Sequence, residues 1–276
     1  AILEPDSRYG YAWLEAIRRA LRPRLPRKRR PCAVFHVWYP SLLEELAAAL
    51  RLSGLDARLV LTAPAEHEDA VRKEAARLAL DAELVIFPNR GRDILPFLRI
   101  AGRLLDEGED IVIKLHTKRS THREDGANWR NELVGRLLAP GRASAIVQAF
   151  HDDPALGIVA PEGHVQPLSF YWGANQTNVD YLCSLMGVRQ PDVESDAFVA
   201  GSMFWCRLEA LAPLLDAPLS EEDFAPESGQ VDGTMAHAVE RVVMLAAQAN
   251  GFAMRTAAAI VGEPDVTGTY AYAKRD

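Results

Sequence analysis

Ile111-Val112-Ile113-Lys114-Leu115-His116 is an almost continuous apolar run that ends in polar residues, and it is the last of four such runs in the first half of the chain. The other three runs cover residues 33–38, 59–61 and 84–87, and helical patterns cover residues 40–52, 66–80 and 94–105. Buried strands that alternate with helices form parallel sheets. The sequence therefore predicts an α/β fold, with a mostly parallel central sheet and helices on both faces. Such sheets bind ligands beyond the carboxyl ends of their strands.

The second half of the chain is less regular. Residues 158–160 and 197–205 have the apolar character of further strands, and a long helix is predicted over 233–250. Residues 1–30 are predicted to form an N-terminal amphipathic helix and a basic linker outside the main domain. Two interpretations of this segment stay open: a peripheral anchor on anionic lipid at the inner membrane, and a helix packed on the main domain.

Composition narrows the class of protein. The 276 residues are 49% hydrophobic, enough for one large α/β domain, and the net charge of -7 argues against nucleic-acid binding. Cys32, Cys183 and Cys206 lack disulfide or metal spacing and are typical of buried thiols in a reducing compartment. No apolar run reaches the roughly 20 residues of a membrane span, and no signal peptide is recognisable. We therefore expect a cytoplasmic location.

Two predicted strands are followed by cationic residues. After the third strand, Arg90 and Arg92 flank a glycine, which suits a phosphate because guanidinium groups bind such oxygens in pairs. The alternative for the neighbouring Asp93 is a helix cap. On the fourth strand, Lys114 and His116 share one face with Lys118 beyond the strand end. Burying such groups is costly unless an anion meets them, so we interpret them as a cradle for a pyrophosphate. The alternative is a strand end that opens onto solvent.

A third polar cluster precedes and enters the last long helix. His237, Glu240 and Arg241 recur at helical spacing on one face, and Glu227 and Asp232 lie in the loop before them. An acid, a base and a cation on one face can form the wall of an active site. The alternatives are ordinary surface pairs and, for Asp232, a helix cap.

Taken together, four motifs resemble the rhamnan synthesis protein F family over about residues 31–252. They are Asn89-Arg90-Gly91-Arg92-Asp93, Lys114-Leu115-His116-Thr117-Lys118-Arg119-Ser120 with Trp129-Arg130 downstream, Ala200-Gly201-Ser202-Met203-Phe204-Trp205, and Asp232-Gly233-Thr234 followed by His237 and Glu240-Arg241. The resemblance implies a glycosyltransferase of polysaccharide and O-antigen assembly. It also implies a nucleotide-activated rhamnose donor (dTDP-rhamnose or GDP-rhamnose) and a lipid-linked glycan acceptor.

The layout is also similar to the GT-A glycosyltransferase architecture. That similarity implies a single domain over 31–276, with a nucleotide-binding half at about 31–125 and an acceptor half at about 126–262. The Asp-x-Asp metal motif of that architecture is found at none of the predicted strand ends. We therefore predict metal-independent stabilisation of the leaving group by fixed cations, with no cofactor.

Glycosyl transfer requires a base, a donor site and an acceptor site, and we assign these residues to those three roles. Asp232 is the predicted base, with Glu227 as the second candidate and His237 beside them. The nucleotide sugar is assigned to Arg90, Arg92, Asp93, Lys114, His116 and Lys118, and the acceptor to Ser202, Trp205, Glu240 and Arg241. A single displacement with inversion follows if Asp232 acts only as a base. The competing hypothesis is a non-catalytic glycan-binding or scaffolding module of a polysaccharide synthase.

Overall fold

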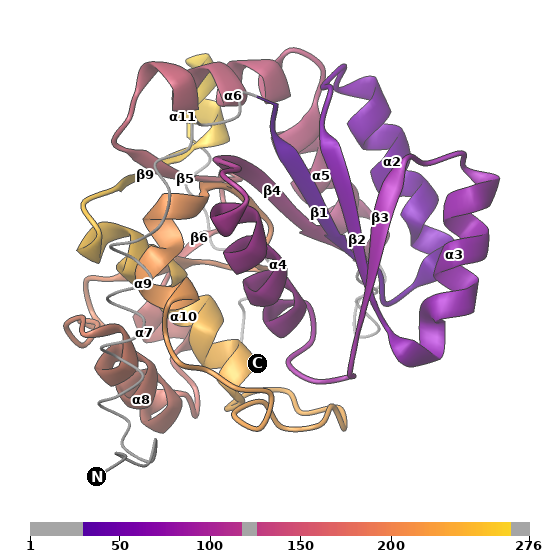
Figure 1. Ribbon diagram of the computed structural model, residues 1–276. Helices are drawn as coiled ribbons and strands as arrows, with labels where there is room; N and C mark the ends of the chain where they lie inside the picture. Colours follow the sequence, from indigo (N-terminus) through magenta and orange to yellow (C-terminus); the bar gives the residue numbers. More distant parts are fainter. Residues whose placement is uncertain (1–29, 118–125, 266–276) are drawn as a thin grey trace, which may run out of the picture.

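The computed structural model describes residues 30–117 and 126–265, which fold around a seven-stranded sheet of order β3-β2-β1-β4-β8-β5-β9 (Figure 1). The strands are β1 (Cys32–His36), β2 (Arg58–Pro64), β3 (Ala82–Phe87), β4 (Ile111–His116), β5 (Leu156–Ala160), β8 (Phe204–Arg207) and β9 (Ala253–Thr256). Six strands run parallel to one another, and β8 is antiparallel to both of its neighbours. The predicted α/β fold with a mostly parallel sheet is confirmed.

Helices cover both faces of the sheet because the strand side chains alternate between two apolar cores. Ala33 and Phe35 of β1 point into one core, and Cys32 and Val34 point into the other. The first core is covered by α2 (Leu43–Leu52), α3 (Glu68–Arg77), α5 (Gly126–Leu138), α6 (Arg142–Asp152) and α11 (Ala257–Val261). The second is covered by α4 (Ile94–Asp106), α8 (Gln176–Met186), α9 (Ala212–Leu215) and α10 (Met235–Ala249). Short turns of helix are η1 (Pro40–Leu42), η2 (Ala65–His67), η3 (Leu208–Leu211) and α7 (Leu168–Tyr171).

The strand order reverses direction at β1. The connection from β1 to β2 crosses one face through α2, whereas the connection from β3 to β4 crosses the other face through α4. A crevice for ligands forms at the carboxyl ends of strands where such a reversal occurs. Here that position lies between His36 and His116, which are paired in register across β1 and β4.

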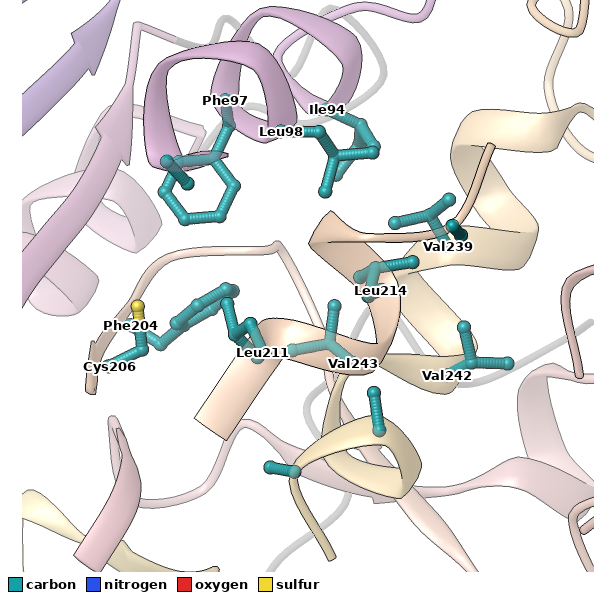
Figure 2. Close-up of a cluster of buried hydrophobic side chains, with 14 of the residues drawn as sticks. Ile94, Phe97, Leu98, Phe204, Cys206, Leu211, Leu214, Val239, Val242 and Val243 are labelled. Atoms are coloured by element: carbon teal, nitrogen blue, oxygen red, sulfur yellow. The ribbon is translucent and has the colours of Figure 1, made fainter. Parts of the chain in front are cut away.

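A block of apolar side chains fixes the second face (Figure 2). Phe97 of α4 faces Phe204 of β8, and Ile94 lies opposite Leu214 of α9 and Val239 of α10. The rings of Phe97 and Phe204 meet edge to face at 6.0 Å between centroids. This packing holds the first turns of α4 and α10 beside the same end of the sheet.

The prediction of a single strand over residues 197–205 is wrong. Ala197–Val199 forms β7, which pairs with β6 (Val165–Pro167) in a separate two-stranded sheet. Gly201 and Ser202 then turn the chain with φ angles of 86° and 53°, and β8 begins at Phe204. Two consecutive left-handed residues cannot belong to a strand, and the apolar residues on either side conceal them in the sequence.

Some predictions concern residues outside the described ranges, and one is not tested by the fold. The N-terminal helix, most of the basic linker and Lys118 lie outside the described residues. The boundary between a nucleotide-binding half and an acceptor half stays a prediction. In residues 30–117 and 126–265, none of the helices is both long enough and apolar enough to cross a bilayer.

Candidate functional site

Lys114 of β4 is buried, with 1% of its surface exposed, and its ammonium group binds other parts of the chain. Nζ donates to a carboxylate oxygen of Asp93, and to the backbone oxygen and Oγ of Ser202 at 2.6 and 3.0 Å. It also lies 5.5 and 5.9 Å from the ring centroids of Phe97 and Phe204, whose faces attract a cation. A buried lysine requires an anion beside it, and Asp93 supplies that anion.

Asp93 occupies the N-cap position of α4, but its side chain makes no capping hydrogen bond. The alternative interpretation of this residue as a cap is therefore wrong. Burial acts to raise the pKa of Asp93, but His116 and Lys114 outweigh burial and hold that pKa well below its ordinary value. His116 Nδ1 lies 3.3 Å from the carboxylate oxygen that Lys114 binds. Both β4 residues are at most 5% exposed, so the interpretation of this strand end as open to solvent is wrong as well.

His36 is a site residue that the sequence analysis missed. It follows the apolar part of β1, as His116 follows that of β4, and the same cost of burying a polar group could have identified it. Its Nδ1 hydrogen-bonds Thr62 Oγ1 at 3.0 Å. Burial lowers the pKa of His36 to about 4, partly opposed by Asp93, so the imidazole is neutral at physiological pH.

The loop between β3 and α4 holds its two arginines differently. Gly91 and Arg92 both adopt left-handed backbone conformations, with φ of 64° and 55°. A Cβ atom on Gly91 would lie 2.5 Å from the Phe224 ring, so only glycine fits there. Arg90 Nη1 donates to the backbone oxygen of Phe224 at 2.9 Å. Arg92 Nε donates to Glu227 at 3.1 Å, and Nη2 donates to the backbone oxygen of residue 230.

Arg92 also contacts His237. Arg92 Nη1 lies 3.0 Å from Nε2 of the imidazole. On the other side of the ring, the Thr234 backbone N–H donates to Nδ1 at 3.4 Å and Thr234 Oγ1 lies 2.8 Å from it, in the capping box at the start of α10. Burial, reinforced by Arg92, lowers the pKa of His237, which keeps the ring neutral.

Glu240 and Arg241 are partners inside the protein. Glu240 Oε1 accepts the backbone N–H of Gly201 at 2.9 Å, and its other oxygen pairs with Arg241 at 2.9 Å. Arg241 donates to the backbone oxygen of Tyr171 at 3.1 Å and stacks over the Phe198 ring at 4.4 Å. Only 8% of its side chain is exposed, so the interpretation as an ordinary surface pair is wrong.

These contacts close into one circuit, which we call the polar ring. Its members are Arg92, Asp93, Lys114, Ser202, Glu240 and His237. The link from Ser202 to Glu240 runs through the backbone of Gly201, and the link from Glu240 to His237 is one turn of α10. Helices α4 and α10 lie side by side (Figure 1). The polar ring joins the start of each helix to β4. The structure thus brings together residues that the sequence assigned to donor, acceptor and catalysis.

Asp232 binds the corner before α8. Its two oxygens accept the Ala174 N–H and Asn175 Nδ2, each at 2.8 Å. A Cβ atom on Gly173 would lie 1.8 Å from one of these oxygens, so the corner requires glycine. Burial acts to raise the pKa of Asp232, but these hydrogen bonds outweigh burial and lower it. Thr234 is the N-cap of α10, so the interpretation of Asp232 as that cap is wrong.

Trp205, predicted to line the acceptor groove, lies in the core instead. It has no exposed surface, and its indole N–H donates to the Leu137 backbone oxygen at 3.0 Å. Alternation along β8 places Phe204 and Cys206 on the α4 face and Trp205 on the opposite face. Trp205 therefore lies across the sheet from the polar ring and is not part of the site.

In the part of the chain that the structure describes, no three His, Cys, Asp or Glu side chains are grouped so that they could hold a metal ion. The prediction of metal-independent chemistry remains untested.

Fold and site together define an α/β protein with a buried polar site at the carboxyl edge of a largely parallel sheet. The family model of rhamnan synthesis protein F matches residues 12–252, and the chain belongs to that family. Membership implies a role in polysaccharide synthesis, and the predicted resemblance is confirmed.

Two relatives come from two strains of Xanthomonas campestris pv. campestris, and each is named "Uncharacterized protein WxcX". Each is 47% identical to this chain over 268 residues. The alignment covers 95% of this chain and 38% of the relative, so the chain corresponds to well under half the length of these proteins.

Proposed function

We propose that this chain is a glycosyltransferase domain that moves rhamnose from a nucleoside diphosphate to a lipid-linked glycan. The observation that carries the proposal is the polar ring, which lies at the reversal of strand order in a member of a polysaccharide-synthesis family. A buried ionic network is costly to maintain and is frequent at functional sites. The predicted inversion of the sugar follows if one base removes the acceptor proton while the diphosphate leaves.

The donor diphosphate is assigned to the outer side of the polar ring, with Arg92 as its principal contact. The Arg92 side chain is 36% exposed, and three of its five N–H groups bind Glu227, Gln230 and His237. The other two are not engaged by any residue in the described ranges, and they match the oxygens of a phosphate. Lys114 is buried and binds Asp93 and Ser202, so we assign it the role of positioning these two residues.

Glu227 is the stronger candidate for the base. Glu227 Oε2 accepts from Arg92 Nε, and no described residue hydrogen-bonds its second oxygen, which leaves a lone pair for an acceptor hydroxyl. Asp232 was the first choice from sequence, but its two oxygens accept hydrogen bonds that lower its pKa. A carboxylate with a lowered pKa is a weaker base. The proton of the attacking hydroxyl would pass to Glu227, and the electrons of the broken glycosidic bond would leave with the diphosphate.

Donor binding and transfer test this proposal directly. Calorimetry with dTDP-rhamnose and GDP-rhamnose should detect one of them, and the same donor should raise the melting temperature, because a ligand bound only by the folded state stabilises it. Transfer to a rhamnose oligosaccharide acceptor, with analysis of the product anomer, then tests inversion. Addition of divalent metal to a chelated preparation tests metal independence. The absence of both donor binding and transfer would refute the proposal.

A scaffolding or glycan-binding module remains the second candidate, and one observation favours it. Lys114 and Asp93 neutralise each other, and Glu240 pairs with Arg241, so much of the charge at the site is satisfied by the chain itself. A scaffold requires no donor. Calorimetry separates the two candidates, since a scaffold shows no affinity for either nucleotide sugar at millimolar concentration.

A further inference from the structure

A second surface lies beside the polar ring, where the corner between α7 and α8 meets the end of the loop that precedes α10. Asp232 fixes this junction through the backbone of Ala174 and the side chain of Asn175, and Asn178 Nδ2 donates to the Gly233 backbone oxygen at 3.0 Å. Two segments far apart in the sequence are thus held together by three hydrogen bonds. The junction is rigid enough to present neighbouring side chains in fixed positions.

Aromatic side chains occupy one side of this junction. Phe170 is 36% exposed, and Tyr171 and Trp172 are partly exposed. The rings of Phe170 and Tyr171 pack at 4.9 Å between centroids, and Tyr171 meets Phe198 edge to face at 5.5 Å. The Trp172 indole N–H donates to Gln176 Oε1 at 3.1 Å, which orients the indole ring. These contacts pre-organise the rings, so a ligand that stacks on them loses little side-chain entropy.

An exposed aliphatic side chain completes the surface on the other side of the junction. Val231, next to Asp232, is 89% exposed. Val231 and Phe170 are two of the three large apolar side chains with substantial exposure among the described residues, and both flank this junction. Exposed apolar groups beside oriented polar groups are typical of ligand sites. We call Phe170, Tyr171, Trp172 and Val231 the aromatic corner.

Charge identifies the kind of ligand. No lysine or arginine occurs in residues 143–188 or 208–240, and Arg241, which lies behind the aromatic corner, is paired with Glu240 and has only 8% of its side chain exposed. An anionic headgroup or a nucleic acid would require such cations. A neutral pyranose instead offers C–H groups to the negative faces of aromatic rings and hydroxyls to carboxylate and amide groups. Gln176 provides such a group, since Asp180 binds only one of its two amide N–H groups, and the methyl group of a 6-deoxyhexose would suit Val231.

We propose that the aromatic corner binds a neutral pyranose unit of the glycan acceptor, with Trp172 as its main stacking surface. The assignment deepens the proposed function, because it places the acceptor on the α10 side of the polar ring and the donor on the α4 side. It replaces Trp205, which lies in the core, as the aromatic contact of the acceptor.

Saturation-transfer NMR with a rhamnose trisaccharide tests this assignment on the full chain. The wild-type protein should transfer saturation to the protons of the bound sugar. Trp172→Ala should weaken sugar binding by about tenfold, since an aromatic contact contributes about that factor. Trp172→Phe keeps a ring and should retain most of the binding. Val231→Ser should weaken binding about twofold to threefold, whereas Leu52→Ser, a matched exposed aliphatic position on α2, should leave it unchanged.

The outcomes separate this assignment from the function itself. Donor affinity by calorimetry should stay within about twofold in Trp172→Ala, because the stacking surface does not touch the diphosphate. Glycan binding lost in Trp172→Ala supports the aromatic corner even if neither nucleotide sugar binds, in which case the transferase proposal fails alone. Absence of glycan binding in wild type, or wild-type binding in a folded Trp172→Ala, overturns the assignment.

Discussion

The two ends of the central sheet carry ionic clusters whose central cations, Arg58 and Lys114, differ in exposure. At the amino ends of the strands, Arg58 binds Glu83, Glu107 and Glu109 at 2.5–3.1 Å, and Arg103 joins them. The side chains of Arg58, Glu83 and Glu107 are 31–35% exposed. At the carboxyl ends, Lys114, Ser202 and His237 of the polar ring are buried, whereas the Arg92 side chain is 36% exposed. Partly solvated charges such as Arg58 contribute little free energy, whereas buried charges such as Lys114, and the Arg207–Asp110 pair at the amino end, must be matched closely.

Backbone conformation separates the two ends further. Three non-glycine residues in the described ranges have left-handed φ angles, and two of them, Arg92 and Ser202, belong to the polar ring. Each costs on the order of 1 kcal/mol. A cluster that only stabilised the fold would gain nothing from that strain. The strain is concentrated at the carboxyl end of the sheet, where the proposed function places the ligand.

The largest effect is expected from the buried pair. Lys114→Met should lower the free energy of unfolding by about 3–5 kcal/mol, because the carboxylate of Asp93 loses its principal counter-ion. Lys114→Met combined with Asp93→Leu removes both charges and should recover most of that stability, measured by urea unfolding. Transfer activity should stay lost in both proteins. Full activity in the double variant would show that the polar ring is structural, like the amino-end cluster.

A second comparison concerns the two candidate bases. Glu227→Gln should reduce turnover by about a hundredfold or more and leave the free energy of unfolding nearly unchanged. Asp232→Asn should instead lower the free energy of unfolding by about 1–3 kcal/mol, because its amide would point an N–H at one of two donors. Single-turnover kinetics and urea unfolding on both variants measure the two effects. Normal turnover in Glu227→Gln would mean that Asp232, and not Glu227, is the catalytic base.

Acidification is expected to destabilise the protein through two buried histidines. Burial lowers to about 4 the folded pKa values of His36 and of His164, a buried residue in the loop between β5 and β6. The unfolded chain therefore binds more protons than the folded one between about pH 6.5 and pH 4. Stability is therefore expected to be full above that window and to fall on acidification, by up to about 3 kcal/mol per histidine. His36→Gln should remove its share, measured as urea midpoints across the window. A pH profile identical to wild type would contradict the burial of His36.

The smallest effect is expected at the amino end. Arg58→Met should lower the free energy of unfolding by about 1 kcal/mol, because the partly solvated carboxylates of Glu83 and Glu107 and the buried one of Glu109 then repel one another. Salt screens that repulsion, so the difference from wild type should shrink as ionic strength rises. Donor binding and transfer should be unaffected at this distance from the polar ring. Loss of donor binding would show that the two ends are coupled.

Much of the first half of the fold was predictable because its strands are continuous apolar runs bounded by helical patterns. Residues 33–38 and 111–115 were placed on β1 and β4 for that reason. The second half was less predictable, since β6 has only three residues and β9 only four, and neither strand is an apolar run. Such strands form because neighbouring strands offer backbone partners, and a single sequence does not reveal those partners.

The site was predictable as a set of residues but not as a set of contacts. Burial of Lys114 demanded an anion, and the sequence alone could not show that Asp93, 21 positions earlier, supplies it. His237 and Glu240 were grouped correctly on one helical face, yet their contacts with Arg92 and Gly201 depend on how α10 packs beside α4. Trp205 was misplaced because alternation fixes its face only once the register of β8 is known.

The antiparallel strand β8 has a consequence for how the protein is made. β5 pairs with β8 and β9 and has no direct partner in β4, so the four residues of β8 join the two parts of the sheet. During synthesis, β4 presents an unpaired edge until residue 207 has left the ribosome, about ninety residues after β4 itself is complete. The closure of that edge brings Ser202 to Lys114, so the polar ring can assemble only when the sheet becomes continuous.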